Sequence, residues 1–164
     1  MALTRRVIVL VGVAALGGCG FALRRAPELR FRTIALRGFA PRSALADELR
    51  MHIDASQTTL VVPLDSRPQA IFEALADARE RSVVASTAAG QVRELQLRSR
   101  LRFRLVRGDG QELIAPSEIV QSRDMSYSET AALAKELEEA ALYRAMQSDI
   151  VAQVMRRLAA VPTL

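Results

Sequence analysis

An alternation of apolar and polar side chains runs through residues 91–107, "QVRELQLRSRLRFRLVR". Successive side chains of a β-strand point to opposite faces, so the pattern predicts one long strand with an apolar and a polar face. The apolar face would carry Leu95, Leu97, Leu101, Phe103 and Leu105, with Ser99 between them. The polar face would carry Glu94, Gln96 and a ladder of four arginines, Arg98, Arg100, Arg102 and Arg104. The apolar face must be covered by another layer, which predicts a sheet packed against helices.

Three other segments have strand signals. The sequence "RGDG" at 107–110 predicts a tight hairpin, after which residues 111–127 return as a partner strand interrupted at Pro116. Residues 30–37 predict a first strand, and "TTLVV" at 58–62 is a short β-branched run that ends at Pro63. Residues 70–86 fit two structures: the apolar spacing suits a helix, whereas the even positions suit one face of a strand. Helix propensity slightly favours the helix there, because Ala, Glu and Leu dominate the segment.

Two helices are predicted. The first lies near 41–53, with Leu45, Leu49 and Ile53 on one face. The second covers about 129–159, and either a capping box of Ser126 and Glu129 or a cap at Ser128 would start it. Its predicted core stripe consists of Leu133, Leu137, Ala140, Val151, Val154, Met155 and Leu158. Leu142 and Met146 point roughly away from that stripe, so both are predicted to contact a partner protein. Helices on one face of an antiparallel sheet make an α+β sandwich.

The N-terminus is typical of an exported protein. Arg5 and Arg6 precede a ten-residue apolar run, and two glycines then precede Cys19, the single cysteine of the chain. This order predicts a signal peptide over residues 1–18, because about 20 apolar residues are needed to span a bilayer. An ordinary secretory signal with an incidental cysteine is the alternative. The stretch "LGGC" resembles the lipobox of bacterial lipoproteins, which implies a diacylglyceryl group on the Cys19 thiol, cleavage before Cys19 and acylation of its amine. Gly20 stands where an aspartate would imply retention in the inner membrane, so we expect the periplasmic face of an outer membrane.

Composition excludes several functions. The 164 residues suit one domain over 30–160 behind a lipidated tether at 19–29. The net charge of +5 falls to about +3 without the signal peptide, which is too small an excess to indicate nucleic-acid binding. The single histidine, His52, lies in the first predicted helix, and the chain has no metal-ligand spacing, nucleophile motif or glycine-rich phosphate loop. We therefore expect neither an enzyme nor a metal protein, and no cofactor beyond the acyl groups.

Several segments together resemble the LptE family of lipopolysaccharide-assembly lipoproteins, formerly called RlpB. They are "GCGFALR", "GQVRELQL" (90–97), "IAP" (114–116), "SRDMSY" (122–127) and "AALAKELEEAALYRAMQSDIVAQVMRRL" (131–158). The resemblance implies two helices on one face of a mostly antiparallel four-stranded sheet, with residues 70–86 as a strand. It also implies a plug inside the outer-membrane β-barrel LptD, which helps to assemble that barrel and to deliver lipopolysaccharide to the outer leaflet. The alternative is a periplasmic lipid carrier or chaperone with an apolar cavity.

The resemblance also implies lipopolysaccharide-binding residues. Lys135, the only lysine, matches the family's "LAK" motif, where a basic residue is implicated in binding; a surface pair with Glu139 is the alternative. The family's second basic contact is missing, because Ala88 and Ala89 occupy its place, and Arg93 is the nearest substitute. The arginine ladder at residues 98–104 adds a phosphate-binding candidate, because a guanidinium can grip a phosphate with two hydrogen bonds. A solvated sheet face is the alternative for the ladder.

Overall fold

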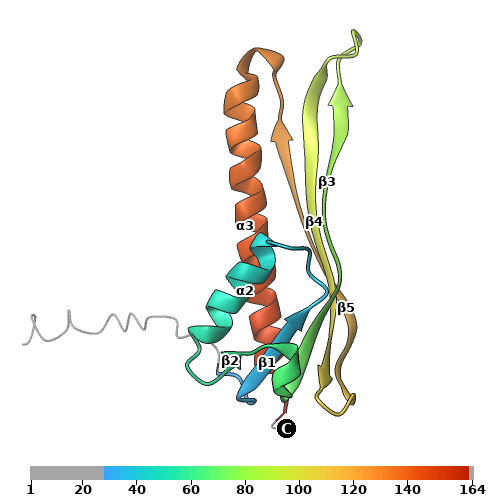
Figure 1. Ribbon diagram of the computed structural model, residues 1–164. Coiled ribbons are helices and arrows are strands. Elements are labelled where there is room, and N and C mark those ends of the chain that lie inside the picture. Colours follow the sequence, from blue (N-terminus) through green and yellow to red (C-terminus); the bar gives the residue numbers. More distant parts are fainter. Residues whose placement is uncertain (1–27, 163–164) are drawn as a thin grey trace, which may run out of the picture.

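Two helices pack on one face of a five-stranded sheet in the computed structural model, which describes residues 28–162 (Figure 1). The strands are β1 (Thr33–Arg37), β2 (Leu60–Val61), β3 (Ala70–Ser86), β4 (Val92–Arg107) and β5 (Glu112–Ser126). The helices are α2 (Ala44–Asp54) and α3 (Ala132–Ala159), with short 3-10 turns η2 (Leu64–Ser66) and η3 (Glu129–Ala131). Neither α2 nor α3 has the length and apolarity needed to cross a bilayer.

The sheet has the order β2-β1-β3-β4-β5 and is mixed. β3, β4 and β5 form an antiparallel meander, whereas β1 runs parallel to both β2 and β3. The prediction of an α+β fold with both helices on one face is confirmed. The prediction of four strands is wrong, because the short run at 58–62 forms β2. A parallel neighbour needs a crossover connection, and α2 supplies it between β1 and β2.

Residues 70–86 form a strand, as the family resemblance implied. β3 pairs with β4 along its whole length, from Ala70 opposite Arg107 to Ser86 opposite Val92. Pairing with a long two-faced strand outweighs the slight helix propensity of the segment, because propensity is a weak local term that tertiary context overrides.

β4 has the two faces that its alternation predicts. Leu97, Leu101, Phe103 and Leu105 are fully buried beneath the helices, and Ser99 is buried among them. On the neighbouring β5, Pro116 lies within the strand where the register shifts between Ser117 and Ile114. The proline is tolerated there because β5 is an edge strand and needs no hydrogen bond on its outer side.

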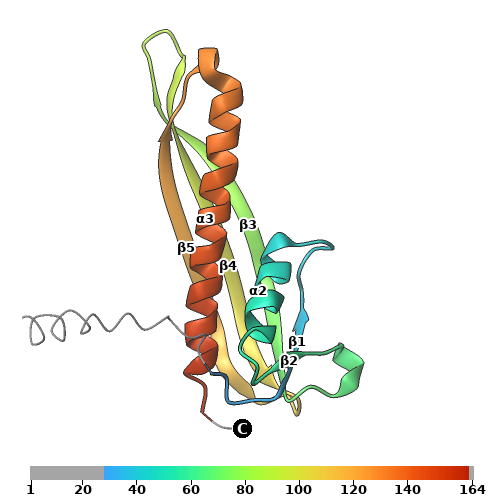
Figure 2. The ribbon, with the colours of Figure 1, turned by 90° about the vertical axis from the view of Figure 1, so that its left-hand side faces the viewer.

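The core consists of two apolar clusters. The main core cluster lies between the sheet, α2 and the C-terminal half of α3, and includes the predicted α2 residues Leu45, Leu49 and Ile53. The tip cluster lies toward the β3–β4 hairpin and consists of Leu95, Leu97, Met125, Tyr143 and Met146. Figure 2 shows α2 beside only one half of the sheet, while α3 runs along nearly its full length. The main core cluster includes Leu29 and Val161, so the folded unit extends one residue beyond each end of the predicted domain.

The N-terminal half of α3 differs from the predicted orientation. Leu133 and Leu137, assigned to the core stripe, are 73% and 66% exposed, and Ala140 is also exposed. Met146 is fully buried and Leu142 is partly buried against the tip cluster, so the prediction that both point outward is wrong. The face that α3 turns to the sheet shifts by about a quarter of a turn along the helix, since each residue advances about 100°. A twisted sheet imposes such a shift on a helix that lies along it.

Candidate anion-binding site

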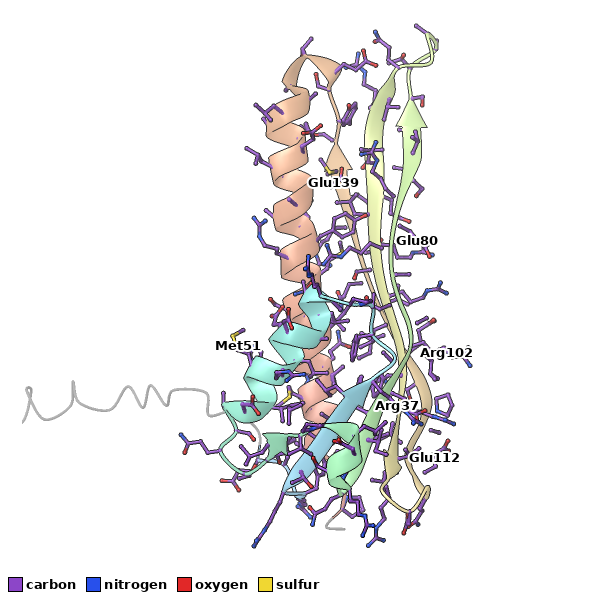
Figure 3. The ribbon with its side chains drawn as sticks, viewed as in Figure 1. Arg37, Met51, Glu80, Arg102, Glu112 and Glu139 are labelled. Carbon is purple, nitrogen blue, oxygen red and sulfur yellow. The ribbon has the colours of Figure 1, made fainter. Side chains whose placement is uncertain are left out.

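The four ladder arginines of β4 lie on the sheet face opposite the helices. Figure 3 shows Arg102 of β4 and Glu80 of β3 pointing away from α2 and α3. Arg98 and Arg102 are exposed, whereas Arg100 and Arg104 are partly buried. The ladder is therefore present as predicted, but its members have two different environments.

Arg104 is held by a buried carboxylate. Its Nε lies 2.5 Å from Oε2 of Glu73 on β3, and Arg37 on β1 forms an ion pair with the same glutamate. The Glu73 side chain is only 6% exposed although it lies on the outward face, because the two arginines cover it. Arg104 is thus already neutralised within the chain.

Arg100 is held more loosely between two strands. Its guanidinium lies 3.5 Å from Glu80 on β3 and 3.7 Å from Glu118 on β5. Within residues 28–162, Arg98 and Arg102 form no ion pair. Exposed guanidinium groups without an internal partner can still bind an external anion bidentately.

Lys135 and Arg93 lie at the same end of the molecule, near the tip cluster. The Lys135 ammonium donates to Oγ of Ser126 at 3.0 Å and to Oε2 of Glu138 at 2.8 Å, and its side chain is 19% exposed. It therefore reaches the end of β5 instead of pointing outward, and the alternative pair with Glu139 is not formed, because that glutamate pairs with Arg81.

Arg93 is exposed at the start of β4, beside the segment that follows β5. Its carbonyl accepts a hydrogen bond from the Tyr127 amide at 2.8 Å, next to the Ser126 that Lys135 contacts. A shallow groove of about 240 Å³ lies alongside, lined by Gln91, Val92, Arg93, Ser128, Glu129 and Thr130. Ser128 is the N-cap residue of η3, which leads into α3, but its side chain makes no capping hydrogen bond. The capping box of Ser126 and Glu129 is wrong, because α3 itself begins after Ala131.

A polar network that the sequence did not indicate lies between the two core clusters. Arg79 of β3 donates to Oε1 of Gln147 at 2.7 Å and stacks over the ring of Tyr143. Gln147 in turn donates to Oε2 of Glu48 on α2 at 2.6 Å. Burial, and next the Glu139 carboxylate, raise the pKa of Tyr143 above its usual 10.0. The network joins β3, α2 and α3, and only their tertiary packing brings its members together.

Two further residues were singled out in the sequence, Cys19 and His52. Cys19 lies outside the described residues. His52 is exposed in the last turn of α2. Within residues 28–162, no group of three or more His, Cys, Asp or Glu side chains is arranged to hold a metal ion.

The fold and sequence match known proteins. Residues 31–158 match the sequence model of the family described as "LptE: Lipopolysaccharide-assembly". The chain belongs to the LptE family. A structure of an uncharacterized lipoprotein B from Nitrosomonas europaea is 31% identical, with a TM-score of 0.71 and coverage of 86% of this chain and 91% of that one. No curated protein matches the chain.

Two less similar structures share the fold. A minor lipoprotein from Acinetobacter baumannii has a TM-score of 0.66 at 18% identity, covering 83% of this chain and 98% of its own. The rare lipoprotein B from Shewanella oneidensis has a TM-score of 0.60 at 20% identity. The match covers 77% of this chain and 90% of that one. The predicted membership of a lipopolysaccharide-assembly lipoprotein family is therefore confirmed.

Two of the predicted binding residues lie near the tip cluster. Lys135 extends from α3 to the end of β5, and Arg93 lies at the start of β4. The turn between β3 and β4 is Thr87–Gly90, closed by a 2.9 Å hydrogen bond from the Gly90 amide to the Thr87 carbonyl. In this LptE-family chain the tip therefore has its basic side chains on α3 and β4.

Proposed function

We propose that this protein is an outer-membrane lipoprotein, anchored through Cys19 at the periplasmic face, that plugs the LptD β-barrel and helps to assemble it. In this proposal it also delivers lipopolysaccharide to the outer leaflet. Membership of the LptE family supports the assignment, and so does the lipobox that precedes Cys19. The proposal includes no catalytic role.

The filled interior is the observation that favours a plug over a lipid carrier. A carrier of acyl chains needs a large apolar cavity between the sheet and the helices. That space is packed with side chains of the main core cluster and the tip cluster. Two grooves of about 360 and 370 Å³ are lined with charged side chains, including Asp77 and Arg79 in one and Glu136 and Arg144 in the other. A polar outer surface also suits the polar lumen of an outer-membrane barrel.

The proposed lipopolysaccharide contacts fall into two groups. Lys135 and Arg93 form the tip group, and the exposed Arg98 and Arg102 form the ladder group. Arg100, Arg104 and Lys135 are each paired with a glutamate, so a phosphate must compete with those carboxylates for them. Charge-assisted hydrogen bonds from these groups to lipid phosphates are about twice as strong as neutral ones.

Binding of purified lipopolysaccharide to the detergent-solubilised lipoprotein tests the ligand assignment. Lys135→Asp should weaken binding while thermal stability and LptD association stay near wild type. The double variant Arg98→Gln/Arg102→Gln should weaken binding in a manner that fades as salt is raised, because exposed charges are screened. The matched Arg100→Gln variant should have a smaller effect. Wild-type binding by both the lysine variant and the double variant would contradict this assignment.

Purification of the lipoprotein from detergent extracts tests the partner assignment. A β-barrel protein recovered in equal amount supports the plug. Recovery of the lipoprotein alone with bound lipid would support the carrier or chaperone instead.

A further inference from the structure

The edge of β3 is unpaired over its distal half. β1 covers that edge only as far as Arg37 opposite Glu73, whereas β3 continues to Ser86. β1 then ends at Gly38, which has a φ of +84° and passes so close to β3 that a Cβ would lie 2.1 Å from the Ala74 carbonyl oxygen. Beyond this point, no strand of residues 28–162 lies on the side of β3 away from β4 (Figure 1).

The opposite edge of the sheet is protected, by contrast. β5 carries Pro116 within its length, and Arg157 of α3 donates to the Glu118 carbonyl at 3.4 Å. Proline and covering side chains are common devices against pairing at sheet edges. The distal half of β3, "ALADARERSVVAS" from residue 74 to 86, has no proline.

A groove of about 370 Å³ runs between this β3 edge and α3. It is lined by Arg79, Arg81, Glu136, Glu139, Ala140, Tyr143 and Arg144. Tyr143 donates to the Glu80 carbonyl at 2.7 Å, so α3 approaches β3 there and one carbonyl of residues 78–86 already has a side-chain donor. α2 packs on the main core cluster, beside only one half of the sheet (Figure 2), and contributes no residue to the lining of this groove.

Apolar side chains are exposed on both elements beside the groove. Val83 and Val84 of β3 are 53% and 49% exposed, and Leu133 and Leu137 of α3 are exposed still further. The lining itself carries three arginines against two glutamates, so it has an excess of positive charge.

We propose that residues 78–86 of β3 accept an extended segment of a partner protein as a sixth strand, with its acidic side chains facing α3. Pairing at an exposed strand edge provides affinity through main-chain hydrogen bonds and specificity through alternate side chains. Arg79 and Arg81 both project toward α3, where they contact Gln147 and Glu139. An added strand would place its own side chains of that face beside the two arginines, and acidic residues would complement them.

Two other occupants fit the surface less well. A second copy of the chain could pair with this edge about a two-fold axis at Glu80. Arg79 of each copy would then stand opposite Arg81 of the other. Like charges directly opposite each other destabilise a sheet. An acyl chain would have to lie against charged side chains, because five of the seven lining residues are arginine or glutamate.

Amide hydrogen exchange of the full-length lipoprotein in detergent tests the proposal. The probe is a blocked synthetic peptide of about eight alternating glutamates and valines, a usual strand length. A matched peptide carries lysine in place of glutamate. The glutamate peptide should slow exchange at residues 78–86, and the lysine peptide should not. Neither peptide assay needs lipopolysaccharide or LptD, so the result stands apart from the proposed function.

Charge reversal in the groove completes the test. Two variants reverse a charge of the groove: Arg81→Glu on β3 and Arg144→Glu on α3. Each should weaken the affinity for the glutamate peptide by about tenfold or more, equivalent to about 1.4 kcal/mol. Arg50→Glu, on the exposed face of α2, should leave the affinity unchanged. Protection at β5, equal binding of the lysine peptide, or unchanged affinity in both groove variants would overturn the proposal. Dimers with residues 78–86 protected before any peptide is added would also overturn it, in favour of a second copy.

Discussion

Glu73 holds one of the four ladder arginines, Arg104, away from a ligand. It lies on the outward face of β3, yet two arginines, Arg37 and Arg104, cover its carboxylate. A carboxylate shielded in this way contributes more than an exposed surface pair, for which the median contribution is about 0–1 kcal/mol. Register explains the pairing, because Glu73 stands directly opposite Arg104 on β4 and opposite Arg37 on β1.

Replacing this carboxylate should measurably destabilise the fold. We expect Glu73→Gln to lower the free energy of unfolding by about 1–3 kcal/mol, the usual range for hydrogen bonds to a charged group. Urea denaturation followed by circular dichroism measures the change. Glu80→Gln is the matched control, because that side chain is 50% exposed and its nearest guanidinium nitrogen is 3.5 Å away. Equal effects of the two substitutions would mean that the burial of Glu73 has no energetic consequence.

α3 turns different faces to the sheet along its length. Near its C-terminus, Val151, Val154 and Leu158 are fully buried in the main core cluster. Near the tip, Tyr143 and Met146 take over this role, and Lys135 bonds to the end of β5. A single stripe drawn along the whole helix therefore describes only its second half, because a twisted sheet rotates beneath a straight helix.

Truncating one buried and one exposed side chain of α3 tests which face of the helix packs on the sheet. Met146→Ala should lower the free energy of unfolding by about 2–5 kcal/mol, because it leaves a cavity in the tip cluster. Leu137→Ala should change it by less than about 0.5 kcal/mol, as is usual for exposed positions. Chemical denaturation of both variants measures the difference. A larger loss of unfolding free energy for the leucine variant than for the methionine variant would support the predicted stripe with Leu137 in the core.

At the scale of the whole molecule, the sandwich is complete only in the half that contains α2. The main core cluster joins both helices to the sheet, whereas the tip cluster is covered by α3 alone. The chain enters the main core cluster at Leu29, ten residues after Cys19.

Membrane attachment is predicted to depend on Cys19. Cys19→Ala should yield an unprocessed or soluble periplasmic form, because a protein without acyl chains loses about 0.8 kcal/mol of membrane binding per methylene. Gly20→Asp is the matched variant: it should stay acylated but move to the inner membrane. Mass spectrometry of membrane fractions follows both outcomes. Cleavage elsewhere with a free Cys19 thiol in the wild-type protein would refute the prediction.

The sequence by itself determined the features that depend on neighbouring residues. The alternation in β4, the apolar spacing in α2 and the hairpin at 107–110 are local backbone properties, and each appears in the structure as its pattern indicates. The tertiary structure alone decided which face of α3 is buried, because that depends on the twist of strands distant in the sequence. It likewise decided which ladder arginines are neutralised, because the register of β3 and β5 against β4 places Glu73, Glu80 and Glu118 beside them. Side-chain periodicity is set by local geometry, whereas the partners of each face are set by long-range packing.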